Sequence, residues 1–250
     1  MSLRFQHAIV VGASSGIGAE IARQLAADGA SVAIVGRRVT ELEAVAAGIR
    51  SAGKGKVLVA PHDVTQYDSA PPLFEKLVAD LGGLDLVVYA AGNIFVPAES
   101  EYDFAKDRAM IEVQVIGAMA WTHLAAAHFE AQRSGTIVGL SSIAGERGRR
   151  TMPGYTTAKA ALSAWLEALR NRVSRYGVNV VTVKLGFVDT IMTAKLTKKP
   201  MMISAQKAAD SILATARRGG SPSAFIPGQW GLVGMIIRSI PSAIFRRLDL

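Results

Sequence analysis

The stretch Gly12-Ala13-Ser14-Ser15-Gly16-Ile17-Gly18 follows a short apolar run at Ala8–Val11 and precedes an amphipathic pattern at Ala19–Asp28. Glycines allow the backbone to turn tightly and to approach a pyrophosphate, which the N–H groups and dipole of a helix N-terminus stabilise. A glycine triplet is also typical of a plain turn, but its place between a strand and a helix favours a dinucleotide-binding loop. We expect contacts to the dinucleotide from Gly12, Ser14, Ser15, Gly16, Ile17 and Gly18.

Beyond this loop, short apolar runs alternate with longer amphipathic stretches. The runs are Ala8–Val11, Ser31–Val35, Lys56–Ala60, Leu84–Ala90, Gly135–Leu140 and Asn179–Lys184. Regular alternation of this kind predicts an α/β fold, a Rossmann-type doubly wound parallel sheet in a single domain over residues 1–250. A helix is expected at Thr157–Tyr176, ending before Gly177. We expect residues 193–227 to form a substrate-loop region and residues 228–250 an apolar, basic C-terminal tail.

The composition is that of a folded globular protein, with 50% hydrophobic and 19% charged residues. The chain contains no cysteine, which excludes disulfides and thiolate nucleophiles, and its four histidines are scattered, so no metal site is expected. The N-terminus shows no signal-peptide pattern, and no uninterrupted apolar run reaches the roughly 18 residues of a spanning helix. These features favour a cytoplasmic protein.

The formal net charge of +8 is concentrated near the C-terminus. From Lys195 to Leu250 there are nine Lys/Arg and two Asp/Glu, which gives +7 and leaves +1 for the rest of the chain. Such a basic end is compatible with nucleic acid, anionic lipid, a phosphorylated substrate or a solvated face. No nucleic-acid recognition motif is present, so we expect no nucleic-acid partner.

The second apolar run ends at Gly36-Arg37-Arg38, where NAD-binding folds usually carry an acidic residue for the adenosine ribose. Without that carboxylate, Arg37 and Arg38 favour the 2′-phosphate of NADP(H). The alternative is that both arginines lie on a solvent-exposed face. Asp63 and Val64 follow the third run and are expected near the adenine, although an aspartate here also suits a turn cap.

Ser142, Tyr155 and Lys159 form the strongest constellation of reactive side chains. Ser142 follows a predicted central strand, and the spacing of Tyr155 and Lys159 places both on one face of a helix. A nearby ammonium would favour the phenolate form of a tyrosine, whose ordinary pKa is about 10. Taken singly, each of these residues also suits a structural role.

With these motifs together, Ala8 to about Met192 resembles the short-chain dehydrogenase/reductase family. The resemblance implies that Tyr155 is the acid/base in hydride transfer between a carbonyl and an alcohol, that Ser142 holds the substrate oxygen, and that Lys159 binds the nicotinamide ribose and lowers the tyrosine pKa. It also implies cofactor contacts from Ala90, Ala91, Gly92, Val188 and Thr190. The family often has Asn where this chain has Ala90, and its fourth catalytic residue, also Asn, corresponds to Gln114.

The family resemblance further implies a homodimer or homotetramer that pairs through helices expected at Ile111–Arg133 and Thr157–Tyr176. Patches at residues 141–150 and 240–248 resemble reductases of polyprenyl-phosphoryl keto-pentoses, so a lipid-linked keto-sugar is an alternative to a generic small carbonyl or alcohol substrate. An alternative function is that of a regulatory protein that binds the cofactor without catalysing a reaction. Basic and apolar residues suited to a phosphorylated or lipidic substrate are Met192, Lys195, Lys198, Lys199, Met201 and Met202.

The tail carries apolar residues at helical spacing beside Arg238, Arg246 and Arg247. These apolar residues are Trp230, Val233, Ile237, Ile240 and Ile244. Such a stripe suits peripheral contact with an anionic membrane, and it equally suits packing on the fold itself or on a partner subunit. Pro241 would kink any long helix in this segment.

Overall fold

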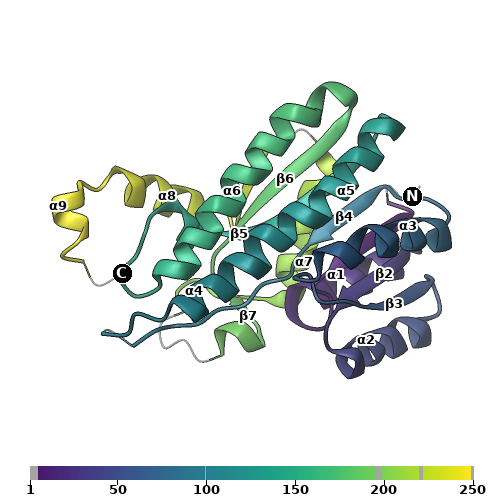
Figure 1. Ribbon diagram of the computed structural model, residues 1–250, viewed down its shortest axis with the longest axis horizontal. Helices are drawn as coiled ribbons and strands as arrows, with labels where there is room; N and C mark the ends of the chain where they lie inside the picture. Colours follow the sequence, from purple (N-terminus) through teal and green to yellow (C-terminus); the bar gives the residue numbers. More distant parts are fainter. Residues whose placement is uncertain (1–4, 99, 195–198, 220–221, 249–250) are drawn as a thin grey trace.

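The computed structural model describes residues 5–98, 100–194, 199–219 and 222–248. Its centre is a parallel sheet in the order β3-β2-β1-β4-β5-β6-β9 (Figure 1). The strands are β1 His7–Val11, β2 Ser31–Gly36, β3 Val57–Pro61, β4 Leu86–Tyr89, β5 Gly135–Ser142, β6 Val178–Leu185 and β9 Ser223–Ile226. The order reverses between β1 and β4, so the predicted doubly wound Rossmann-type fold is confirmed.

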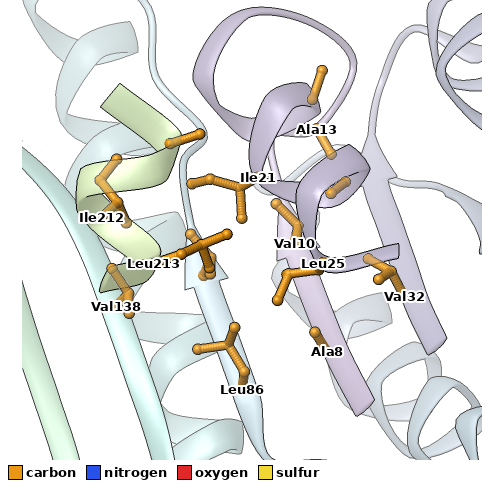
Figure 2. Packing of buried hydrophobic residues seen from close by; sticks show 14 of the residues in the cluster. Ala8, Val10, Ala13, Ile21, Leu25, Val32, Leu86, Val138, Ile212 and Leu213 are labelled. Atoms are coloured by element: carbon orange, nitrogen blue, oxygen red, sulfur yellow. The ribbon is translucent and has the colours of Figure 1, made fainter. Parts of the chain in front are cut away.

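Helices cover both faces of the sheet and bury alternate residues of each strand. They are α1 Gly16–Ala27, α2 Val39–Ala52, α3 Ala70–Leu81, α4 Phe104–Ile111, α5 Gly117–Gln132, α6 Pro153–Val173 and α7 Ala205–Arg218. On β1, Val10 packs with Leu25 of α1 and Leu213 of α7 (Figure 2), whereas Ile9 packs with Trp121 of α5 on the opposite face. This alternation follows from the period of two along a strand.

The region expected as a substrate loop, residues 193–227, contains regular structure that the sequence pattern did not predict. Helix α7 and the edge strand β9 lie within it, and Ile203–Ser204 (β8) pairs with Val188–Asp189 (β7) in a small second sheet. Strand β9 has only four residues, most of them partly or fully exposed, so it lacks the continuous apolar run of the central strands. Lys195 and Lys198 lie outside the described residues.

The two helices expected to pair subunits begin earlier than the sequence pattern indicates. Helix α6 starts at Pro153, and a 3-10 turn at Ser174–Tyr176 follows it before Gly177, whose φ is +78°. Helices α4 and α5 join through a π-helical turn at Glu112–Ile116. The joined stretch, residues 104–132, is long and apolar enough to span a bilayer by length and composition, but more than half of its most apolar window is buried in the fold.

The C-terminal tail forms two short helices, α8 Trp230–Ser239 and α9 Ser242–Phe245. Trp230 and Ile237 are buried, so the first part of the predicted apolar stripe packs on the body of the protein. Helix α8 ends at Ser239, so the break expected at Pro241 is present, and Ile244 is exposed on the separate α9.

Candidate active site

A cleft of about 450 Å³ lies at the carboxyl ends of the central strands. This is where ligands bind in open parallel sheets. Of the expected site residues, only Asp63 and Gln114 are missing from its walls. Those present are Gly12, Ser14, Ser15, Gly16, Ile17, Gly18, Arg37, Arg38, Val64, Ala90, Ala91, Gly92, Ser142, Tyr155, Lys159, Val188 and Thr190.

The glycine loop is packed against two strand ends, with no room for side chains at two of its glycines. A Cβ on Gly12, whose φ is +89°, would lie 2.4 Å from the backbone nitrogen of Ala91. A Cβ on Gly18 would lie 2.3 Å from the carbonyl oxygen of Gly12. The loop therefore brings the N-terminus of α1 over the end of β4, an arrangement that fits a dinucleotide pyrophosphate.

Arg37 and Arg38 line the same end of the cleft but make different contacts. Arg38 Nη2 donates to Ser14 Oγ at 2.8 Å and to Ser15 Oγ at 2.6 Å. Arg37 is mostly exposed, with its Nη1 3.4 Å from Asp63 Oδ2. Asp63 also accepts from the Thr65 backbone at 3.0 Å, the turn-cap alternative considered from the sequence. The pKa of Asp63 is lowered overall. Burial raises it, but the hydrogen bonds from Thr65 and the nearby charge of Arg37 lower it by more.

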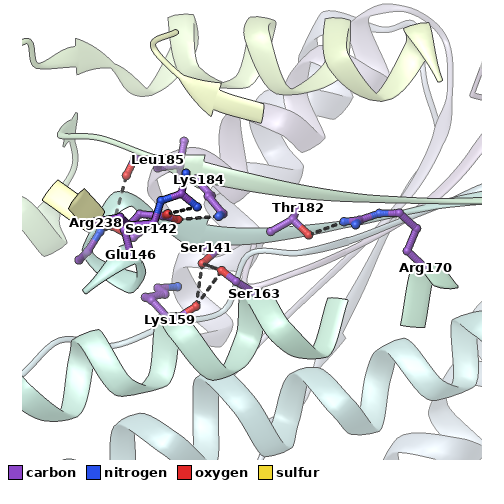
Figure 3. A network of polar contacts seen from close by, with 11 residues as sticks. Ser141, Ser142, Glu146, Lys159, Ser163, Arg170, Thr182, Lys184, Leu185 and Arg238 are labelled. Carbon is purple, nitrogen blue, oxygen red and sulfur yellow. Dashed lines mark hydrogen bonds and ion pairs between the residues drawn. The ribbon is translucent and has the colours of Figure 1, made fainter. Parts of the chain in front are cut away.

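Ser142, Tyr155 and Lys159 meet where the end of β5 faces the first turns of α6. Ser142 Oγ donates to the Leu185 carbonyl at 3.2 Å and accepts from the Ala144 backbone at 3.1 Å. Lys159 Nζ donates to the Leu140 carbonyl at 2.9 Å and lies 5.7 Å from the centroid of the Tyr155 ring. Figure 3 shows the Lys159 carbonyl accepting from Ser141 and Ser163, which ties α6 to β5.

The pKa of Tyr155 differs in direction from the sequence-based expectation. Burial raises it, and this effect exceeds the lowering by a hydrogen bond from Ser142 and by the charge of Arg149. Burial lowers the pKa of Lys159 to about 8. In the protein alone, both groups therefore favour their neutral forms more than they would in water.

Gln114 is fully buried in the π-helical turn, behind the cleft wall. Its Nε2 donates to the Asn93 carbonyl at 2.9 Å, and its Oε1 has no partner among the described residues. A Cβ on Gly92 would be 3.6 Å from that oxygen. π-Turns in α-helices occur frequently at functional sites, and a buried acceptor without a partner calls for an explanation, so Gln114 stays a candidate site residue.

Three contacts near the site are not predicted by the sequence. Asn93 anchors Gln114, the charge of Arg149 acts on Tyr155, and Trp230 of α8 packs against Gly186 in the loop after β6. A Cβ on Gly186 would lie 1.9 Å from Trp230 Nε1. The Asn93–Gln114 and Gly186–Trp230 contacts join residues far apart in the chain, so local patterns carry no signal for them. The direction of the Arg149 side chain likewise depends on packing.

Comparison with known proteins gives a consistent result. A family model described as short chain dehydrogenase matches residues 6–201. The chain is 34% identical over 245 residues to an uncharacterized oxidoreductase of Mycobacterium tuberculosis strain H37Rv, covering 96% of each protein. It is 32% identical over 246 residues to an uncharacterized oxidoreductase of Myxococcus xanthus, covering 97% of this chain and 96% of that protein.

Solved structures are similar over most of the chain. A short-chain type dehydrogenase/reductase from Mycobacterium marinum superposes with a TM-score of 0.81 at 26% identity, covering 87% of this chain and 92% of that one. A similarly described structure from Mycobacterium ulcerans, at 23% identity, has a TM-score of 0.83 and covers 99% of this chain and all of the other, which supports the fold.

The packing at Gly18 predicts that Gly18→Ala weakens dinucleotide binding, because the new methyl group pushes α1 away from the Gly12 carbonyl. We expect an affinity loss of about tenfold or more, in line with a displacement of the helix N-terminus from the ligand. The measurement is a fluorescence titration with NADPH. Gly48→Ala is the matched control, since a Cβ there meets nothing within 4 Å. Equal affinities of the two variants would contradict the prediction.

Proposed function

Because the chain belongs to the short-chain dehydrogenase family, we propose that it is an NADP(H)-dependent oxidoreductase that interconverts a carbonyl group and an alcohol, with Tyr155 as the acid/base. The observation that carries the proposal is the meeting of Ser142, Tyr155 and Lys159 on the wall of the cleft that also contains the glycine loop. Three reactive side chains from two elements lie beside a loop suited to bind a dinucleotide. This arrangement is explained better by a shared role in this reaction than by three separate structural roles.

The proposed chemistry in the reduction direction assigns one task to each side chain. When bound, the nicotinamide dinucleotide supplies the hydride. Tyr155 gives its phenolic proton to the carbonyl oxygen, and Ser142 donates a hydrogen bond to the same oxygen. Lys159 would hold the nicotinamide ribose, and its ammonium would stabilise the phenolate left on Tyr155 until solvent returns the proton. Oxidation of an alcohol uses the same groups in reverse.

Other expected residues would hold the cofactor around these groups. The pyrophosphate would lie on the glycine loop, the nicotinamide end near Val188 and Thr190, and the adenine end near Val64. Gln114 would act behind the site, where its free Oε1 would accept a hydrogen bond in the proton path. Asp63 is already engaged by Thr65 and Arg37, so we assign it to supporting the arginine rather than to the adenine.

The proposed preference for NADP(H) predicts that Arg37→Ala and Arg38→Ala each weaken NADPH binding and leave NADH binding nearly unchanged. Each substitution removes a cation from the end of the cleft where a 2′-phosphate would lie. Loss of a charge-assisted hydrogen bond there should lower the affinity for NADPH about tenfold or more. Isothermal titration with both cofactors measures it. Arg50→Ala, on the far end of α2 beside Glu43, is the control. Equal wild-type affinities for NADPH and NADH would contradict the preference.

The role of Tyr155 predicts that Tyr155→Phe lowers turnover by about 10²- to 10⁴-fold, the usual contribution of general acid catalysis, while NADPH still binds. The substitution keeps the ring and removes only the transferable proton. Turnover is measured as NADPH oxidation with a panel of carbonyl compounds. Tyr176→Phe is the control, because this tyrosine lies after α6 beneath Arg133 and Arg175, away from the cleft. Near-normal turnover of Tyr155→Phe would remove the tyrosine from the mechanism.

Within the carbonyl class, the side chains at the mouth of the cleft favour a phosphorylated or lipid-linked substrate. Ile191 and Met192 line the cleft and are themselves exposed. Met201 and Met202, also exposed, follow Lys199 closely in the chain, and the Lys199 amine donates to the Ala194 carbonyl at 3.1 Å. Adaptable apolar side chains next to a cation suit an amphiphilic molecule. The carbonyl panel should therefore include a lipid-linked keto-sugar beside simple ketones.

We also infer a cytoplasmic homodimer or homotetramer that pairs through the outer faces of α5 and α6. The exposed side chains of these helices include the small Ala127, Ala164 and Ala168, which would let two helix pairs approach closely. The expected result is a dimer or tetramer at micromolar concentration in light scattering. Substituting Ala164→Glu should shift the protein toward the monomer, whereas a wild-type monomer would contradict the inference.

A further inference from the structure

The exposed large apolar side chains are concentrated at one end of the molecule. Among the described residues, all but Val39 and Ile116 lie in segments that follow the carboxyl ends of β4, β6 and β9. Figure 1 shows α8 and α9 at the same end as the beginnings of α4 and α6. Scattered exposed apolar residues are normal on a protein surface, but their concentration around one opening points to a contact.

Helix α8 supplies the most regular part of this surface. Leu232, Met235 and Ile236 stand at helical spacing and are 61%, 54% and 55% exposed, whereas Trp230 and Ile237 on the other side are buried. The inner face of α8 is buried by the body of the protein, so its outer face can be buried only by contact with another molecule. The orientation of the helix is set by its inner face, so the outer apolar face is a stable feature of the fold.

Two neighbouring side chains in the segment after Ser142 hold α8 and α9 in place. Glu146 is almost fully buried and pairs with Lys184 at 2.5 Å and with Arg238 at 3.3 Å (Figure 3). Arg147 donates to the Ile237 carbonyl at 3.0 Å and to Ser242 Oγ at 3.1 Å, and its guanidinium lies 4.2 Å from the Phe245 ring centroid. The two helices are therefore fastened to the body as one unit.

The charge of this unit has one sign. No Asp or Glu occurs between Asp210 and Asp249, whereas Arg246 and Arg247 are exposed directly after α9. An apolar face beside arginines, without acidic residues, complements the headgroups and upper acyl region of an anionic bilayer. A protein partner with the same complementarity would need an apolar face ringed by acids.

The position of the cleft favours a bilayer over a second copy of the chain. Ile191 and Met192 line the cleft and are themselves exposed, so the opening and the apolar face of α8 lie at the same end of the sheet. A rigid protein covering that end would lie across the opening and hinder exchange of substrate and cofactor. A fluid lipid surface leaves room for both and can present an amphiphilic molecule to the opening directly.

We propose that the outer face of α8 and α9, defined by Leu232, Met235, Ile236, Ile244, Arg246 and Arg247, docks on the surface of an anionic lipid bilayer with the cleft opening beside it. Apolar insertion and attraction to headgroups act together, as in other interfacial helices. The docking does not depend on the oxidoreductase chemistry, and binding can be measured without cofactor or substrate.

The test is co-sedimentation of the full chain with vesicles of phosphatidylcholine containing phosphatidylglycerol, against vesicles of phosphatidylcholine alone. We expect stronger binding to the anionic vesicles and release at high salt. Each arginine near an anionic surface strengthens binding about fivefold, so Arg246→Ala/Arg247→Ala should weaken it about 25-fold. Arg50→Ala/Arg172→Ala is the charge-matched control on other surfaces. We expect it to bind like the wild type.

The apolar part is tested separately with Met235→Gln/Ile236→Gln, which keeps helix-forming side chains of similar size and should weaken binding by about tenfold or more. Val39→Gln/Ile116→Gln is its matched control. Melting temperatures report whether each variant is folded. Absence of wild-type binding to anionic vesicles, or binding unchanged in both tail variants, overturns the proposal. Loss of self-association by the glutamine variant in light scattering, without vesicle binding, assigns the face to a second copy instead.

Discussion

The close approach of Gly12 to the backbone of Ala91 is the constraint on which the architecture of the site depends. β1 and β4 are neighbours in the sheet although more than seventy residues separate their ends, and the chain reverses its winding between them. The Val35 carbonyl accepts from the backbones of both Gly12 and Ala13, at 2.8 and 3.1 Å, so the loop is also pinned to β2. Three strands thus fix where α1 begins. The position of that helix N-terminus determines where an anion is stabilised, and the cleft extends from there toward β5 and α6.

The parts of the fold that the sequence predicts are those governed by local rules. Strands such as Ala8–Val11 are short, apolar and bounded by turn residues, and the spacing of Tyr155 and Lys159 places them on one helix face because an α-helix repeats every 3.6 residues. The π-helical turn around Gln114 has no such local cause. It accompanies a hydrogen bond to Asn93, twenty-one residues away in the chain, and that partner is determined only once α4 and β4 are packed. Strand β9 was missed for a related reason, since pairing with β6, rather than an apolar run, makes it a strand.

The arginines show most clearly what sequence cannot decide. Arg147 and Arg149 stand two residues apart in one short segment, yet Arg147 turns to the carbonyls at the end of α8 while the charge of Arg149 acts on Tyr155. A guanidinium has five donors in a planar fork and meets whichever acceptors the tertiary structure presents. Which acceptors an arginine side chain binds is therefore determined by tertiary packing. As a result, the segment after Ser142 contains both Arg147, which binds the C-terminal helices, and Arg149, whose charge acts on the proposed proton donor.

The electrostatics of the buried Tyr155 and Lys159 suit proton donation more directly than proton removal. Burial raises the pKa of the phenol and lowers that of the ammonium to about 8, so in the protein alone the proton stays on the tyrosine well above neutral pH. That is the form needed to protonate a carbonyl oxygen. Alcohol oxidation needs the phenolate, which burial disfavours, and further positive charge must stabilise it. Arg149 supplies part of that charge, and an oxidised nicotinamide ring would add more. In the proposed mechanism, the direction of the reaction is therefore coupled to the charge of the cofactor through a tyrosine that is held neutral until that charge arrives.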